Sequence, residues 1–117
     1  PSYEVKADYH RVVSAIQDAH RHFATGIYGL WYPVIERSST ERLLQNLQST
    51  GISRQLRIEH CVAPDGSMRG MTGSGMLFIN PPWQLQAQAS TLLPWLNQVL
   101  TEGQGNWQVE WTVPEPV

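Results

Sequence analysis

Cysteine and charge are scarce in this sequence, and long apolar runs are absent from it. Cys61 is the one cysteine among 117 residues, which excludes an internal disulfide framework and a Cys-x-x-Cys metal or redox site. Charged residues make up 15% of the chain and the formal net charge is −2, so the chain offers no overall basic field to a nucleic-acid backbone. We find no segment of membrane-spanning length and no signal peptide, and we expect a cytoplasmic protein that contacts no membrane.

The apolar content, in contrast, is sufficient for a core. Hydrophobic residues account for 41% of the 117 residues, which is enough for a single α/β unit that spans residues 1–117. The chain starts at Pro1 and not at an initiator methionine, so we expect it to be part of a longer protein.

Hydrophobic periodicity predicts three helices and four strands in the order α-β-α-β-β-α-β. Apolar residues recur at helical spacing after Asp8, after Ser38 and from Trp83 to Glu102. Pro94 lies inside the last of these segments, where it either kinks the helix or begins a second one. Extended runs that are apolar or alternate between apolar and polar residues predict strands at 27–35, 55–62, 76–79 and 107–113.

Local signals predict how these segments begin and which sides they bury. Asp8 is expected to cap the first helix, and Ser38 with Glu41 matches a capping box for the second. The strand at 55–62 alternates in a way that favours a half-covered strand near a sheet edge, and 107–113 predicts one aromatic face packed on the core. Five residues of the last helix are expected to point inward, namely Leu85, Ala89, Leu92, Leu96 and Leu100.

A strand followed by Asn80-Pro81-Pro82-Trp83 has the form of the catalytic motif of adenine N6-methyltransferases, in which the aromatic ring stacks on a flipped base. The alternative is a buried strand followed by a helix that a proline begins. Ligands of open α/β sheets bind outside the carboxyl ends of parallel strands. Because the strand at 76–79 follows a loop and must run back antiparallel, we expect Asn80 and Trp83 at the opposite edge. In that position Asn80 caps the last helix and Trp83 packs where the helix meets the sheet.

Three glycines before that strand, Gly70, Gly73 and Gly75, are spaced as in a phosphate-binding loop. Phosphate loops follow a strand and open a helix, whereas this segment leads into a strand, so a tight connection is the better interpretation. Arg69 could still contact a phosphate, together with nearby hydroxyl side chains.

Four short segments of this sequence occur in the same order in the members of a known protein family. They are Pro1-Ser2-Tyr3-Glu4, residues 24–33 (Ala-Thr-Gly-Ile-Tyr-Gly-Leu-Trp-Tyr-Pro), residues 70–75 (Gly-Met-Thr-Gly-Ser-Gly) and residues 79–83 (Ile-Asn-Pro-Pro-Trp). Through them the chain resembles the RlmJ-type adenine-N6 methyltransferases of large-subunit ribosomal RNA, a family also labelled as involved in catabolism of external DNA. The resemblance covers nearly the whole chain. It implies the second half of a Rossmann-like class I methyltransferase sheet with helices on both faces, and a missing N-terminal half of the same domain.

The resemblance also implies a site. The family's motif is Asp-Pro-Pro-Tyr followed by Glu, and residues 1–4 match its last four positions with Ser2 in place of the second proline. Tyr3 would stack on the target adenine, and the carbonyls of Pro1 and Ser2 would accept the N6 hydrogens. Glu4, Tyr32 and Arg69 are further candidates for substrate contact.

The implied partners are ribosomal RNA, the missing half, and S-adenosylmethionine, which that half would mainly bind. This chain alone is then expected to be inactive. The strand at 27–34 would present an unpaired edge, through which the isolated chain would self-associate.

Two further classes of function stay open at this stage. Five tryptophans, with no complete catalytic set in the chain, are compatible with a non-enzymatic RNA- or protein-interaction module. Four histidines raise the alternative of a metal enzyme. However, His20 and His22 do not share a helix face, and no cysteine or carboxylate stands at ligand spacing, so we expect no metal site.

Overall fold

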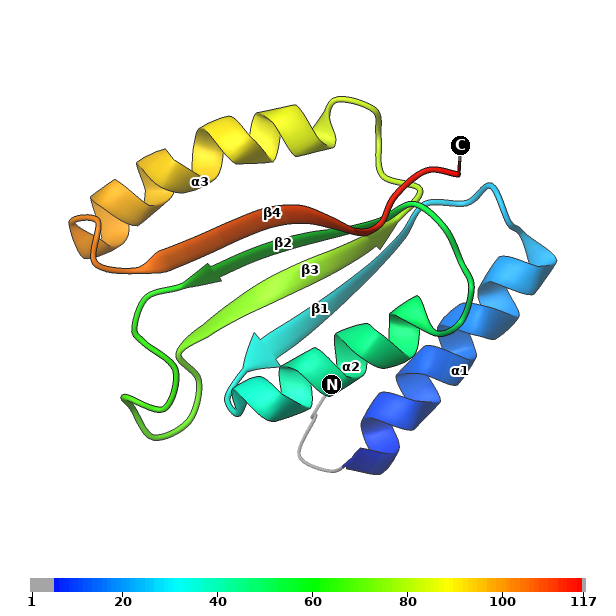
Figure 1. The fold of residues 1–117 in the computed structure, drawn as a ribbon, viewed down its shortest axis with the longest axis horizontal. Coiled ribbons are helices and arrows are strands. Elements are labelled where there is room, and N and C mark those ends of the chain that lie inside the picture. Colours follow the sequence, from blue (N-terminus) through cyan, green and yellow to red (C-terminus); the bar gives the residue numbers. More distant parts are fainter. Residues whose placement is uncertain (1–5, 117) are drawn as a thin grey trace.

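The computed structural model describes residues 6–116, which form three helices and four strands (Figure 1). Along the chain these are α1 (Lys6–His22), β1 (Tyr28–Val34), α2 (Arg37–Gln48), β2 (Gln55–Cys61), β3 (Gly73–Ile79), α3 (Leu85–Thr101) and β4 (Asn106–Val113). The described part therefore has a mixed α/β architecture, as the hydrophobic periodicity predicts. No helix within 6–116 is both long and apolar enough to cross a membrane.

The four strands form one sheet in the order β1-β3-β2-β4, and all neighbouring strands are antiparallel. Since β1 and β2 both run opposite to β3, they are parallel to each other and their carboxyl ends lie at the same edge of the sheet. In Figure 1, α3 lies on one side of the sheet while α1 and α2 lie on the other.

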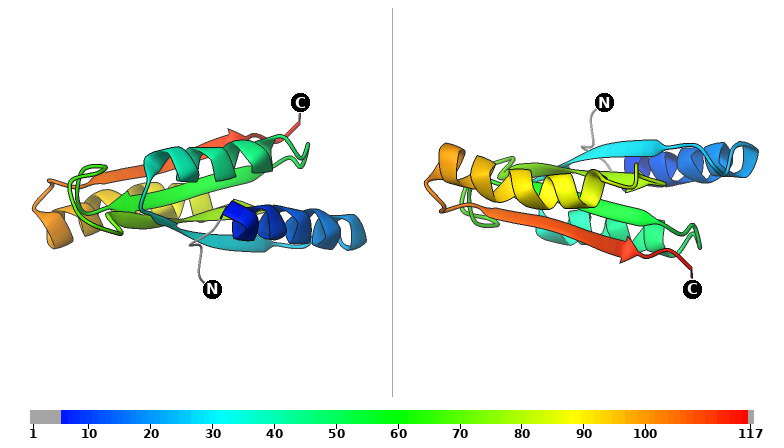
Figure 2. Two further views of the ribbon diagram at one scale, coloured as in Figure 1. Left: turned by 90° about the horizontal axis from the view of Figure 1, so that it is seen from below. Right: turned by 90° about the horizontal axis from the view of Figure 1, so that it is seen from above.

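The main core lies between the sheet and the two N-terminal helices, which Figure 2 shows from two further directions. Successive side chains of a strand point to opposite faces, so alternate residues of β1 enter this core. Leu30, Tyr32 and Val34 pack with the leucines of α2, and α1 adds a partly buried row. The buried leucines of α2 are Leu43, Leu44 and Leu47, and the row from α1 comprises Tyr9, Val12, Val13 and Ile16.

Helix α3 buries only part of the side that was expected: Ala89 is buried and Leu85 and Leu96 are half-buried, but Leu92 and Leu100 are exposed. Its buried residues are Ala89, Leu93 and Asn97, whereas Leu92 is 50% and Leu100 62% exposed. The helix is rich in apolar residues on more than one side, so the 3.6-residue period does not select the face that meets the sheet. Pro94 lies inside one continuous helix, so no second helix begins at this proline.

The expected caps are wrong for both N-terminal helices. Helix α1 already begins at Lys6, so Asp8 lies within it and not before it. Helix α2 begins at Arg37 after Glu36, which makes no side-chain capping bond, so the Ser38–Glu41 capping box does not form. The carboxylate of Glu41 instead accepts bonds from two arginines.

Strand β2 lies in the interior of the sheet, between β3 and β4, and not near an edge. Its polar face is covered more completely than its apolar face, because Arg57 is 4% and Glu59 3% exposed while Ile58 and His60 are only half-buried. The edge strands are β1 and β4, and the aromatic face of β4 is only partly covered, with Trp107 still 37% exposed. The alternation of β2 was thus correctly predicted, but its burial was not.

Candidate functional site

The loop between β2 and β3 lies at the sheet edge where β1 and β2 end. The Thr72 backbone N–H donates to the Val34 carbonyl over 2.8 Å, and the Val62 N–H donates to the Thr72 carbonyl over 2.9 Å. This is the edge at which open α/β sheets bind their ligands. Arg69 is exposed in this loop, as a phosphate contact requires.

The motif candidates at the start of the chain, Pro1, Ser2, Tyr3 and Glu4, lie outside the described residues. Their assignment stays a prediction.

Asn80 and Trp83 lie at the opposite edge, where β1 begins, since Tyr28 pairs with Ile79. The Asn80 amide donates to the carbonyls of Ala24 and Gly26 over 2.8 and 3.0 Å. Asn80 therefore ties together two connecting segments, and the expectation that it caps α3 is wrong. The backbone φ of Asn80 is 54°, a left-handed conformation that asparagine tolerates better than most residues.

Trp83 does not pack between α3 and the sheet. Its side chain is 85% exposed, because α3 begins two residues later at Leu85 and its inner face does not include this ring. The expectation of a buried Trp83 is thus also wrong. The position of the motif, however, agrees with the argument that Asn80-Pro81-Pro82-Trp83 only resembles a catalytic motif.

Tyr32 has no exposed side-chain surface, so it is not placed for contact with a substrate. It lies inside β1, and its hydroxyl donates to Glu59 over 2.9 Å. A Cβ added to Gly75 would clash with the Tyr32 ring, so this glycine is required for close packing. The pKa of Tyr32 is raised, first by burial and then by the adjacent Glu59 carboxylate.

A network of buried charges, missed at the sequence level, surrounds Glu59. Glu59 accepts bonds from Arg57 and Arg37, each over 2.9 Å. Burial alone would raise the pKa of Glu59, but the hydrogen bonds from these arginines outweigh it and lower the pKa. The signal available in the sequence was the alternation of charged and apolar residues along β2, which gains this meaning only once α2 covers the charged face.

The network reaches the loop through Arg37. Arg37 Nε lies 2.9 Å from Asp65 Oδ2, and its Nη2 lies 3.2 Å from Oδ1, so the two groups form a bidentate pair. This bond holds the pKa of Asp65 below its usual range. A polar cavity of about 270 Å³ adjoins the pair, lined by Arg37, Glu41, Glu59, Cys61, Ala63, Asp65, Asn106 and Gln108. Burial raises the pKa of the Cys61 thiol, which disfavours a reactive thiolate there.

His60 takes part in a structural bond. One ring nitrogen lies 2.9 Å from Asn97 Oδ1, which joins β2 to α3. Within the described part of the chain no group of three potential ligands could hold a metal ion.

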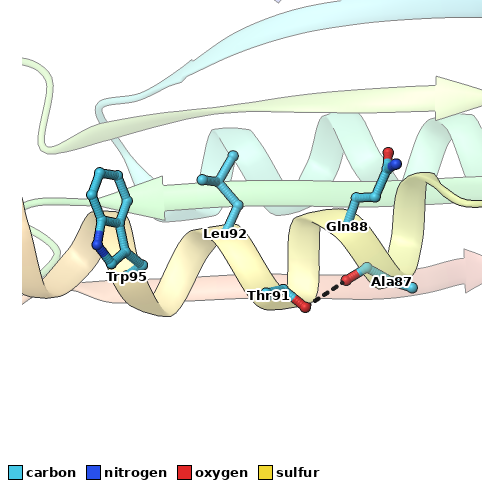
Figure 3. Close-up of a pocket in the computed structure, with 5 residues that line it drawn as sticks. All are labelled: Ala87, Gln88, Thr91, Leu92 and Trp95. Carbon is cyan, nitrogen blue, oxygen red and sulfur yellow. Dashed lines mark hydrogen bonds between the residues drawn. The ribbon is translucent and has the colours of Figure 1, made fainter.

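An open apolar hollow lies on α3 (Figure 3). Trp95, Leu92 and Gln88 point to the same side of the helix, and Trp95 is 60% exposed. Trp31, on the same face of the sheet, is 41% exposed. Helix α3 thus covers only part of this face and leaves large apolar side chains exposed beside it.

Comparison with known proteins gives a consistent result. A family model described as "Ribosomal RNA large subunit methyltransferase D, RlmJ" matches residues 1–113. Two proteins named ribosomal RNA large subunit methyltransferase J, from Haemophilus influenzae and Escherichia coli, are each 51% identical over 116 residues. The aligned part is 98% of this chain and 41% of each relative, so the chain spans less than half of their length.

A solved structure shares this fold. The crystal structure of protein LPL1258 from Legionella pneumophila superimposes with a TM-score of 0.85 at 34% identity, over 95% of this chain and 41% of that one. Since the family model covers nearly every residue, the chain belongs to the RlmJ family of ribosomal RNA large subunit methyltransferases.

Proposed function

We propose that this chain is the C-terminal part of an S-adenosylmethionine-dependent methyltransferase that modifies N6 of an adenine in large-subunit ribosomal RNA. The observation that carries the proposal is the family match over residues 1–113, which includes the Pro1–Tyr3 segment. The identity of 51% to two relatives that are named for this substrate class supports it.

The sheet supports a Rossmann-like assignment. Parallel strands β1 and β2 follow helices α1 and α2, and the antiparallel β3 lies between them. The free edge of β1 and the apolar face around Trp31 and Trp95 are then the surfaces on which the N-terminal half of the domain would continue the sheet and cover the core.

The roles proposed for residues 1–4 are those that the resemblance to the family's motif implies. Tyr3 would stack on the target adenine, and the Pro1 and Ser2 carbonyls would accept the N6 hydrogens and so leave the nitrogen lone pair free. Glu4 would lie beside this group. Arg69, exposed at the carboxyl edge, would bind a phosphate of the RNA, because a guanidinium pairs well with phosphate oxygens.

The described residues do not fit the cofactor by themselves. A dinucleotide-type site needs a glycine-rich turn between a strand and a helix, whereas Gly73 and Gly75 lie in β3 against Cys61 and Tyr32. S-adenosylmethionine supplies the methyl group when it is bound, and we assign none of its contacts to this chain. The isolated chain is therefore expected to bind no cofactor at micromolar concentration in calorimetry and to transfer no methyl group.

The test is single-turnover methylation by the full-length parent. Tyr3→Ala removes a stacking platform worth about 1–3 kcal/mol per base, so the rate should fall about tenfold or more. Trp83→Ala is the matched control, because this exposed ring lies at the other edge of the sheet, and its rate should equal that of the wild type. If Tyr3→Ala keeps its rate while Asn80→Ala folds normally and loses methyl transfer, the catalytic assignment moves to Asn80.

A further inference from the structure

The bidentate Arg37–Asp65 pair joins an exposed loop to the core of the protein. Asp65 is 47% exposed, whereas Glu59, which also binds Arg37, is 3% exposed. Glu59 is fixed in turn by Arg57 and by the Tyr32 hydroxyl. The Asp65 carboxylate is thus held by a chain of hydrogen bonds that ends among fully buried side chains.

The rest of the loop has few contacts that would fix its position. Its ends are held by the backbone bonds of Val62 and Thr72, and the Ser67 hydroxyl bonds only to Pro64 within the loop. Within the described residues, Asp65 is the one side chain between positions 64 and 71 that bonds to the remainder of the molecule. Without this bond the loop would be free to sample other conformations.

Arg69 lies four residues after Asp65, and glycines stand on both sides of it at positions 66 and 70. These glycines have φ values of 72° and 81°, left-handed conformations that set the direction of the loop on each side of Arg69. The position of the Arg69 guanidinium therefore depends on where the Asp65 end of the loop is held. A group that is already in place loses less freedom on binding than one that has to be ordered.

We propose that Arg37 and Asp65 are positioning residues for RNA binding, which hold the 62–72 loop so that Arg69 meets a phosphate of the substrate. This inference rests on the proposed function, because it takes RNA as the substrate of the parent. Neither residue touches the reacting atoms. Their effect is on the KM for RNA and not on the chemical step.

The negative charge of Asp65 allows an experiment to distinguish a positioning role from a direct electrostatic effect on RNA binding. Asp65→Asn removes a negative charge from a surface that would face RNA phosphates, so charge alone predicts tighter RNA binding. A positioning role predicts weaker binding, because the neutral amide cannot accept both bonds from the Arg37 fork. The two effects have opposite signs.

The experiment measures kcat and KM for RNA and for S-adenosylmethionine with the full-length parent. Asp65→Asn should raise the KM for RNA about three- to tenfold and leave kcat and the cofactor KM unchanged. Arg69→Ala should raise the KM for RNA by a similar factor. It should also reduce by about 1 the slope of the logarithm of the RNA-binding constant against the logarithm of the salt concentration. The double variant Asp65→Asn/Arg69→Ala should have the same KM for RNA as Arg69→Ala alone, because Asp65 acts through Arg69.

Asp18→Asn is the matched control, since it removes the same charge from an exposed Asp–Arg pair on α1. Its KM for RNA should not rise. Arg37→Lys, which keeps the charge and loses the fork, should behave like Asp65→Asn. Thermal melting of each variant confirms that it is folded.

Failure of the positioning role and failure of the proposed function would give different results. If the wild-type parent methylates this RNA but Asp65→Asn lowers or leaves its KM, or adds fully to Arg69→Ala, the positioning role is overturned and the proposed function stands. If the wild-type parent transfers no methyl group to ribosomal RNA, the proposed function falls, and with it this inference.

Discussion

At the scale of single residues, Glu59 is a carboxylate that is buried between two arginines. It is 3% exposed and compensates two arginines, Arg57 at 2.9 Å and Arg37 at 2.9 Å. A buried ion pair need not add to stability relative to an apolar pair of the same volume. Removal of one partner, however, leaves the remaining charges buried and poorly compensated.

Glu59→Gln should therefore lower the free energy of unfolding by about 3–5 kcal/mol. Glu110→Gln is the matched control, because Glu110 also pairs with Arg57 but is 52% exposed, and its loss should be under about 1 kcal/mol. Urea denaturation of the full-length parent measures both values. Equal, small losses for the two variants would show that the Glu59 network contributes no more than a surface pair.

At the scale of structural elements, the connection from β3 to α3 depends on Asn80 in two ways. Its amide donates to the carbonyls of Ala24 and Gly26, and its φ of 54° is unfavourable for residues with an ordinary side chain. Asn80→Ala removes the bonds and adds backbone strain, whereas Asn80→Gly removes the bonds only.

We expect Asn80→Ala to lower the free energy of unfolding by about 2–3 kcal/mol, the sum of lost hydrogen bonds and left-handed strain. The decrease in the free energy of unfolding should be about 1 kcal/mol smaller for Asn80→Gly than for Asn80→Ala. Thermal denaturation of the two variants and the wild type provides the comparison. If glycine is no better than alanine at this position, the left-handed conformation does not contribute to the loss.

The elements also show how far the sequence predicts the structure. Strand and helix positions followed from periodicity, because alternation in β2 and helical spacing in α2 report directly on backbone geometry. The buried side of α3 did not, since Leu92 and Leu93 are equally apolar and only contact with the sheet selects one of them. The prediction that β2 is half-covered near an edge was wrong for a related reason, because nothing in the local sequence indicates that α2 covers Arg57 and Glu59.

For the candidate site, too, some features were predicted correctly from the sequence and others were not. Strand direction put Asn80 and Trp83 at the edge opposite the carboxyl ends, and the pairing of β3 with β1 and β2 agrees. Tyr32 was misassigned because a tyrosine near a strand end serves equally well as a core residue. Its burial depends on Gly75 across the strand pair, a contact between residues distant in sequence.

At the scale of the whole molecule, the charge network predicts how stability depends on pH. Hydrogen bonds from arginines lower the pKa of Glu59 and Asp65, so their contribution is complete above the ordinary carboxyl values near 4 and is lost as pH falls through the lowered values. Burial and Glu59 raise the pKa of Tyr32, so its contribution is complete below about 10 and is lost as pH rises further.

These groups should thus leave the free energy of unfolding nearly constant from about pH 5 to pH 9 and lower it on both sides. Urea denaturation of the parent within this range and on both sides of it measures the profile. Tyr32→Phe should be less stable throughout but should lack the part of the alkaline decline that comes from this phenol. An unchanged alkaline decline in Tyr32→Phe would assign it to other groups.

The isolated chain should associate through the edge formed by β1. Among the described residues β1 pairs only with β3, and the strand sequence Tyr-Gly-Leu-Trp-Tyr-Pro-Val contains no charged residue to protect its free side. Pro33 is the one residue that opposes strand addition, and the flanking Ile27 and Ile35 are 61% and 49% exposed. Trp31, 41% exposed on the face of the sheet that α3 covers only in part, enlarges the apolar surface beside this edge.

We therefore expect dimers or larger species of the 117-residue chain at micromolar concentration in light scattering coupled to size-exclusion chromatography. Trp31→Lys should shift the distribution towards monomer, because a charge beside an open edge disfavours pairing with a second strand. Trp83→Lys is the matched control, since it makes the same change at a more exposed tryptophan that follows β3 near the start of β1 and lies outside both strands, and it should alter association less. A wild-type chain that stays a monodisperse monomer at high concentration would show that the β1 edge is protected in some other way.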